Sequence, residues 1–251
     1  KPLMALAIVG MPINVLPHET IARILEGGQS VCRDAGIPLA GGHSIDSVEP
    51  IYGLVGIGLV NPKHLKRNSD ARPGDVLILG KPLGVGILSA ALKKDLLDAE
   101  AYATMIDATT RLNRPGAELA TLDGVHALTD VTGFGLLGHT LEMARGASLT
   151  ARLDSRAIPF LPNVIDLASS GIKTGASGRN WASYGAGVDI SAGAPPFLQD
   201  LLTDPQTAGG LLVACAPEAA NDVLKCFNRS GFAQATAIGH METGPGRVQV
   251  R

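Results

Sequence analysis

The chain has 251 residues, of which 45% are apolar and 18% are charged. This composition excludes a disordered chain, which would be poor in apolar residues and strongly charged. The 21 basic and 23 acidic side chains give a net charge of −2, so no basic excess favours binding to nucleic acid or to an anionic membrane. Aromatic residues make up only 4%, which argues against a base-stacking surface.

The cysteines and the apolar runs indicate a cytoplasmic protein. Cys32, Cys215 and Cys226 are odd in number and form no CxxC pair, so neither a disulfide framework nor a zinc knuckle is expected. We expect three buried thiols in a reducing compartment. No apolar run reaches the roughly 18 residues of a membrane span, and no signal peptide is recognised.

The N-terminal part of the chain is expected to contain two strands and a helix. A continuous apolar run indicates a buried strand at 3–10. Apolar residues recur every three or four positions over 18–35, which predicts a helix, and Gly36 stands where a helix commonly ends. A second strand is expected at 50–60, after a glycine-rich turn.

The segment from Pro62 to Pro73 is polar and basic, has proline at both ends, and is the best candidate for a domain boundary. It is either a solvated linker, which is the simpler interpretation, or a basic binding patch. We therefore divide the chain into a first domain, residues 1–70, and a second α/β domain, residues 71–251.

The second domain is expected to alternate strands with helices, which is the pattern of an α/β or α+β fold. The strands are expected at 76–79, 125–129, 149–153, 210–215, 234–240 and 246–250. The helices are expected from Gly86 to about Lys94 and at 99–113, 115–122, 134–145, 196–202 and 217–230. The stretch 171–196 is rich in glycine, serine and asparagine, and it predicts a long loop with some strand.

The first candidate site is the Ala-Gly-Gly-His-Ser sequence that ends at Ser44. In a turn, the successive N–H groups of Gly41 and Gly42 can form a nest for phosphates, because no Cβ blocks their approach. His43 and Ser44 add side-chain donors. A plain tight turn between the helix and the second strand is the alternative.

The second candidate is Asp130, which ends an apolar strand just before a helix. A carboxylate there can bind a hard cation such as Mg2+, which usually bridges to nucleotide phosphates. The alternative is helix capping by Asp130 or Thr132. One carboxylate is too few for a metal site, so further ligands would have to come from elsewhere.

Two polar segments have two interpretations each. The loop Asp204–Thr207, Asp-Pro-Gln-Thr, joins a helix to a buried strand and has the polar density of a site loop, but an Asx-type turn explains it equally well. The Gly178–Gly185 segment contains the only tryptophan, Trp181. It is either a substrate-side loop or simple packing of that ring.

Lys81 follows a strand and precedes a helix, as in a P-loop. The segment lacks the Gly-Lys-Ser/Thr ending, so a P-loop is rejected. Lys81 could still neutralise a phosphate, although a solvated side chain is favoured. Because no nucleophile motif is recognised, a catalyst of this sequence would work by positioning phosphates and metal.

Taken in order, these motifs resemble the selenophosphate synthetases of the aminoimidazole-ribonucleotide synthetase superfamily. The resemblance runs over essentially the whole chain, and its markers are Ala40–Asp46, Lys81–Gly84, Leu128–His139, Arg179–Asn180, Ala182–Gly185 and Asp204–Thr207. It implies a two-domain α/β (α+β) fold whose first domain pairs across a homodimer into a barrel. It also implies conversion of ATP, selenide and water to selenophosphate, AMP and orthophosphate, with Mg2+ carrying the nucleotide phosphates.

The resemblance also implies roles for individual residues. Gly41, Gly42, His43 and Ser44 match the family's ATP contact, which is offered to the partner subunit. Asp130 matches one of three Mg2+-binding aspartates. The family's reactive Cys or selenocysteine, its catalytic lysine and the other two aspartates belong to a segment that would precede this sequence, so no catalytic residue is expected here. We therefore expect a fragment with an incomplete N-terminal domain and little synthetase activity of its own.

Two alternatives stay open. One is a sister enzyme, such as a thiamine-monophosphate kinase or a hydrogenase-maturation protein; Arg179-Asn180 and the Asp204–Thr207 loop favour the synthetase over these. The other is a non-catalytic homodimerising module of the same fold, which the sequence upstream would distinguish.

Overall fold

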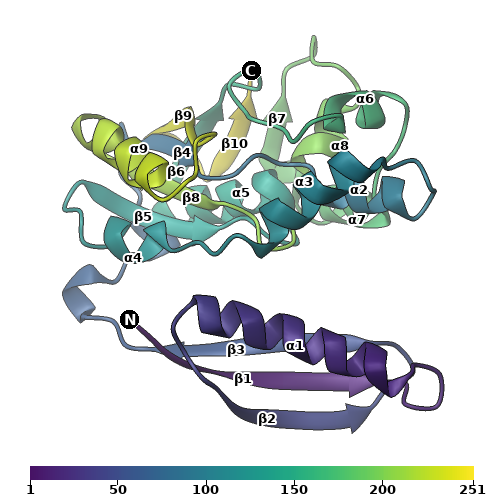
Figure 1. Cartoon of the computed structure of the whole chain (residues 1–251). Coiled ribbons are helices and arrows are strands. Elements are labelled where there is room, and N and C mark those ends of the chain that lie inside the picture. The colour runs from purple at the N-terminus through teal and green to yellow at the C-terminus, as the bar shows by residue number, and fades with distance from the viewer. The chain divides into compact units, whose positions relative to one another are not determined.

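A computed structural model describes all residues, 1–251, in two compact units, Lys1–Leu65 and Lys66–Arg251. Figure 1 shows both units. The mixed α/β class expected from the sequence is confirmed. No helix has the length and apolar character needed to cross a membrane.

The first unit is a three-stranded sheet with one long helix (Figure 1). The strands β1 (Pro2–Met11), β2 (Leu39–Asp46) and β3 (Ile51–Gly58) lie in the order β2-β1-β3, with β2 parallel and β3 antiparallel to β1. The helix α1 (His18–Asp34) connects the two parallel strands, as a crossover must. The two expected strands and the expected helix are confirmed, and Gly36 follows the helix with φ +72°.

The glycine-rich segment before Ser44 lies in β2, so the turn expected there was wrong. Its pairing with β1 shifts register between Ala5 and Ala7, and beyond the shift His43 pairs with Ile8. At this bulge Gly42 has φ +152°, and a Cβ there would lie 1.8 Å from the carbonyl oxygen of Ala7. Only glycine fits this close backbone contact, and glycine is also what hides the strand from sequence patterns.

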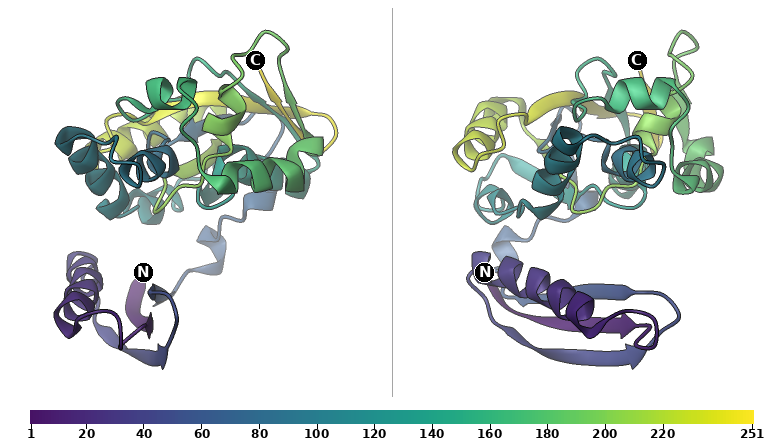
Figure 2. Two further views of the ribbon diagram at one scale, coloured as in Figure 1. Left: turned by 90° about the vertical axis from the view of Figure 1, so that its right-hand side faces the viewer. Right: turned by 45° about the vertical axis from the view of Figure 1, so that its right-hand side comes forward.

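The two faces of this sheet differ. The helix α1 covers one face of the sheet (Figure 2). Ala5, Ala7 and Met11 of β1 and Cys32 of α1 are buried. Side chains alternate along a strand, so the opposite face carries Ile8 and its cross-strand neighbours. Five isoleucine and valine side chains there are between 40% and 52% exposed: Ile8, Ile45, Ile51, Val55 and Ile57. The first unit therefore leaves one apolar sheet face uncovered.

The second unit is built on a seven-stranded mixed sheet in the order β5-β8-β4-β9-β6-β10-β7. Its strands are β4 (Val76–Leu79), β5 (Val125–Asp130), β6 (Leu149–Leu153), β7 (Val188–Ile190), β8 (Leu211–Cys215), β9 (Thr236–Thr243) and β10 (Arg247–Val250). Pairs from β5 to β6 are antiparallel, while β10 is parallel to both of its neighbours. All six strands predicted for this part of the chain are present.

Eight helices surround the sheet: α2 (Val85–Leu92), α3 (Ala99–Thr110), α4 (Pro115–Leu119), α5 (Gly135–Ala147), α6 (Val164–Ser169), α7 (Gly175–Tyr184), α8 (Leu198–Leu202) and α9 (Ala220–Arg229). The long loop expected at 171–196 was wrong because the segment contains α7, whereas the strand also expected there is present as β7. Thr174 caps α7 by accepting from the N–H of Ser177, and Tyr184 packs against Gly138 of α5. Tertiary packing thus overrides the weak helix propensity of glycine and serine.

Both faces of the sheet are covered by helices. In β4, Leu77 and Leu79 join the core formed with α2, α5 and α8, whereas Ile78 joins the core formed with α4 and α9. This alternation explains why the strand is apolar throughout. All three cysteines are buried and free, as expected.

Candidate functional site

Asp130 is the last residue of β5, and its side chain is exposed. Its carboxylate accepts no hydrogen bond. Helix α5 begins only at Gly135, with Phe134 at the N-cap position and no side-chain cap, so the capping interpretation was wrong for both Asp130 and Thr132. The Oγ1 of Thr132 lies instead 3.1 Å from Nε2 of His139. Asp130 is therefore a free carboxylate at the end of a buried strand.

The main chain after Asp130 is held by the segment that precedes β8. The N–H of Val131 donates to the carbonyl of Gly210 at 2.9 Å, and the N–H of Gln206 donates to the carbonyl of Thr132 at 3.0 Å. The turn after Asp130 and the segment that begins with the Asp-Pro-Gln-Thr loop are thus joined by main-chain hydrogen bonds.

Helix α7 holds the same turn from another direction. The amide of Asn180 donates to the carbonyl oxygens of Gly133 and Thr203, at 2.8 and 3.0 Å. The hydroxyl of Tyr184 donates to the carbonyl of Phe134 at 2.5 Å. The segment expected as a substrate-side loop is therefore a helix that supports the turn next to Asp130. The alternative, packing of the Trp181 ring, is confirmed, because that ring packs against the core.

The Asp-Pro-Gln-Thr loop caps the start of α2. The Oδ2 of Asp204 accepts from the N–H groups of Gly86 and Ile87, at 3.0 and 3.2 Å. The Oε1 of Gln206 accepts from the two preceding N–H groups, at 3.1 and 3.2 Å. In an Asx turn, the side chain of Asp204 would accept from the N–H of Gln206. That N–H donates instead to the carbonyl of Thr132, and Asp204 accepts from helix α2, so the Asx-turn interpretation was wrong.

Asp204 is completely buried, and its Oδ1 has no partner. Burial raises the pKa of its carboxyl to about 7, although the bonds from Ile87, Gln206 and Gly86 act in the opposite direction. This carboxylate also occupies the helix N-terminus that a P-loop would offer to a phosphate. The rejection of a P-loop therefore has a structural reason.

Lys81 is buried, with 4% of its surface exposed, so the expectation of a solvated side chain was wrong. Its ammonium donates to the carbonyl oxygens of Ala108, Arg111 and Ala208, at 3.0, 2.6 and 2.7 Å. An ammonium has three N–H bonds, so this one is fully satisfied. Burial is the main cause that lowers its pKa, to about 8.

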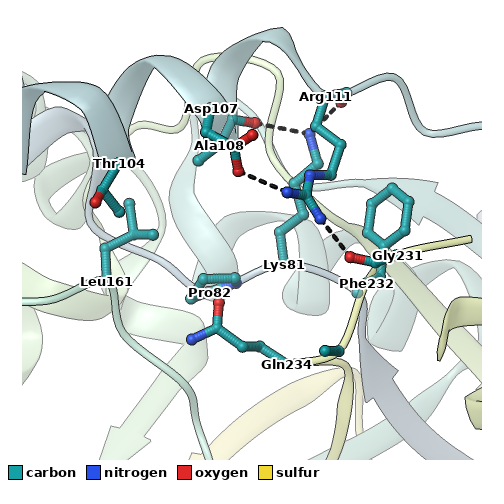
Figure 3. A pocket seen from close by; sticks show the side chains of 12 residues that line it. Lys81, Pro82, Thr104, Asp107, Ala108, Arg111, Leu161, Gly231, Phe232 and Gln234 are labelled. Carbon is teal, nitrogen blue, oxygen red and sulfur yellow. Dashed lines mark hydrogen bonds and ion pairs between the residues drawn. The ribbon is translucent and has the colours of Figure 1, made fainter.

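A cavity of about 360 Å³ lies next to Lys81 (Figure 3). The guanidinium of Arg111 borders it, 2.6 Å from the carboxylate of Asp107 and 5.8 Å from the ring centre of Phe232. Thr104 and Gln234 line it as well. Since the ammonium of Lys81 is engaged with carbonyls, it is not free to bind a ligand there.

The predicted site residues fall into two groups. Asp130, Asn180, Asp204 and Lys81 are brought together within the second unit by the contacts above. The ATP-contact candidates, Gly41 to Ser44, lie in the first unit on the edge strand β2, where the side chains of His43 and Ser44 are exposed.

Sequence reasoning missed three supporting residues. Gln206 and Tyr184 lie within motifs named above, but no role was predicted for either. Asn113 lies in no recognised motif, and its amide donates to the carbonyl of Gly209 at 2.8 Å. No group of three or more His, Cys, Asp or Glu side chains is placed to hold a metal ion. Asp130 fits one oxygen ligand of Mg2+ and would need others.

The fold and the site define the class of protein. The chain belongs to the AIR synthase related protein family: the family's N-terminal domain matches residues 1–60, and its C-terminal domain matches residues 72–251. The predicted resemblance and the predicted fold are thereby confirmed.

Curated relatives narrow the class further. The chain is 72% identical over 249 residues to the selenide, water dikinase of Pseudomonas straminea, covering 99% of this chain and 70% of the relative. It is 69% identical over 250 residues to that of Burkholderia orbicola (strain MC0-3), covering 100% and 71%. It is 57% identical over 250 residues to that of Rhizobium meliloti (strain 1021), covering 100% and 72%.

Solved structures share the fold at low identity. The E. coli HypE structure matches with a TM-score of 0.77 and 21% identity, covering 99% of this chain and 70% of that one. Thiamine-monophosphate kinase from Stenotrophomonas maltophilia K279a matches with a TM-score of 0.72 and 17% identity, covering 99% and 72%. These likenesses establish the fold and nothing further.

Proposed function

We propose that the chain serves ATP-dependent synthesis of selenophosphate from selenide, with AMP and orthophosphate as the other products. The observation that carries this proposal is the identity of 57% to 72%, over essentially the whole chain, with selenide, water dikinases. The free carboxylate of Asp130, held at the end of a buried strand, supports a reaction that depends on a metal and on phosphates.

In this proposal Asp130 is one ligand of Mg2+. When bound, the cation would neutralise charge on the phosphates of ATP. Asp130 suits the role because its oxygens are exposed and unpaired, while the turn that follows it is fixed. The remaining ligands would come from other residues.

The ATP contact in this proposal is formed by Gly41, Gly42, His43 and Ser44. They lie on the edge strand β2, whose outer side has no neighbouring strand. The two glycines have no side chain to obstruct a phosphate, and His43 and Ser44 add exposed donors.

A homodimer formed through the first unit is part of the proposal. The uncovered sheet face of Ile8, Ile45, Ile51, Val55 and Ile57 is the support, since contiguous apolar patches of this kind mark interaction sites. By its pairing with Ile8, His43 belongs to the same face, so a partner on that face would lie next to it. A cytoplasmic location is supported by the three free thiols.

The test is product analysis with protein expressed from the full reading frame. Nucleotides are quantified by chromatography after anaerobic incubation with Mg-ATP, with and without selenide. AMP that forms only with selenide supports the proposal. ADP as the sole nucleotide product contradicts it and favours a sister kinase of the same fold, whereas no nucleotide turnover favours a non-catalytic module.

A further inference from the structure

Every main-chain carbonyl from Thr132 to Phe134, in the turn that follows Asp130, accepts a hydrogen bond, whereas the carboxylate of Asp130 accepts none. Those carbonyls accept from the N–H of Gln206, the amide of Asn180 and the hydroxyl of Tyr184. A carboxylate that accepts no hydrogen bond, next to a turn whose carbonyls are all held in place, is what a preorganised ligand requires.

Asn180 is the side chain that joins this turn to the Asp-Pro-Gln-Thr loop. Its amide donates one N–H to the carbonyl of Gly133 and the other to the carbonyl of Thr203, which directly precedes Asp204. Asn180 is 8% exposed, so solvent does not replace these bonds. Without Asn180, no side chain would donate hydrogen bonds both to the turn and to the residue that precedes Asp204.

Asp204 anchors the loop to the rigid part of the unit. Its Oδ2 holds the N–H groups of Gly86 and Ile87 and also accepts from the amide of Gln206, at 3.0 Å. Helix α2 is itself fixed in the core, where Ile87 and Leu88 are fully buried. A continuous set of bonds therefore runs from α2 through Asp204 and Gln206 to the turn.

We propose that Asn180 and Asp204 are positioning residues for Asp130: they fix the main chain that follows it and hold its carboxylate ready for a divalent cation. Neither residue touches the metal. This inference rests on the proposed function, in which Asp130 binds Mg2+. It assigns one role, positioning of Asp130, to both the Gly178–Gly185 segment and the Asp204–Thr207 loop, for which the sequence allowed two interpretations each.

The experiment measures the Mg2+ concentration that gives half-maximal AMP formation, with protein from the full reading frame at saturating ATP. The variants are Asn180→Ala, Asp204→Ala and Asp204→Asn, with Asp130→Asn as the reference. Asn228→Ala, an exposed asparagine on α9, is the matched control. All assays are run well below each variant's unfolding midpoint, because a purely structural role would lower that midpoint without changing the metal affinity of the folded protein.

The two alanine variants are expected to raise the half-saturating Mg2+ concentration about 10-fold, as removal of groups that orient a metal ligand typically does. Asp204→Asn is expected to restore most of the affinity, because its amide oxygen can still accept from Gly86 and Ile87. If Asp204→Ala does not fold, Asn180→Ala and Asp204→Asn carry the test. The inference is overturned if Asp130→Asn weakens Mg2+ dependence while Asn180→Ala leaves it unchanged. If Asp130→Asn itself has no effect, the metal role of the proposed function falls and the inference falls with it.

Discussion

The ammonium nitrogen of Lys81 and the carbonyl oxygen of Ala208 lie 2.7 Å apart, although 127 positions separate the two residues in the chain. The same ammonium holds the carbonyls of Ala108 and Arg111 at the end of α3. Lys81 therefore ties the end of β4 to α3 and to the loop that supports Asp130. A cation that sequence patterns place in solvent is a structural part of the site.

Replacing Lys81 with methionine tests this role. The variant keeps most of the side-chain volume but leaves three carbonyl oxygens without their donor, so we expect a loss of about 2 kcal/mol in the free energy of unfolding. Urea denaturation followed by circular dichroism measures it. The matched control is Lys225→Met, which removes an exposed lysine of α9 and should change the value by no more than about 0.5 kcal/mol. Equal midpoints for wild type and Lys81→Met would contradict the structural role.

Asp204 predicts a pH dependence of stability. Its pKa is about 7 in the folded protein, against an ordinary value of 3.8. Below pH 3.8 the carboxyl is protonated in both states. Between that pH and 7 the unfolded state has released the proton while the folded state keeps it, so this group's contribution to stability falls as the pH rises through the window.

Asp204→Asn removes that titration. We therefore expect the unfolding free energy of the variant, relative to wild type, to increase between pH 4.5 and pH 7.5. Urea denaturation at a series of pH values measures the difference. A difference that stays constant over this range would show that Asp204 titrates normally.

Asp130→Asn is expected to weaken binding of Mg-ATP with little loss of stability. The amide is a poorer ligand for a hard cation than the carboxylate, and the exposed side chain makes no bond that the fold needs. The measurements are the Mg2+ dependence of activity and the thermal unfolding midpoint, both with protein from the full reading frame. Unchanged metal dependence would remove Asp130 from the metal site.

The uncovered sheet face of the first unit predicts a dimer. Ile8→Glu places a charge at the centre of that face, and sedimentation velocity at micromolar concentration should change from dimer to monomer. Ile165→Glu alters an isoleucine with the same 47% exposure on α6, and it should leave the dimer intact. A wild-type protein that sediments as a monomer would argue against the proposed interface.

The elements that could be predicted from sequence are those whose signal is local. The run Val76–Leu79 is apolar because it is buried on both faces, and the helix 18–35 has a clear apolar period. Strand β2 and helix α7 could not be predicted in this way. Their glycine and serine residues fit a bulge and close helix packing, and these are properties of the neighbouring segments rather than of the residues themselves.

The candidate site was predictable as a set of residues but not as an arrangement. Asp130 was identified from its place at a strand end. The roles of Asn180 and Asp204 depend on partners that lie 47 and 118 positions away in the chain, and no local pattern contains that information. Lys81 was misjudged for the same reason, since its three acceptors are main-chain atoms that any residue could supply.

The most direct test of the central claim is phosphorus NMR of protein expressed from the full reading frame, incubated anaerobically with Mg-ATP and selenide. We expect a new selenophosphate resonance that grows together with AMP and orthophosphate and is absent without selenide. A spectrum in which ATP gives only ADP, or in which turnover is the same without selenide, would contradict it.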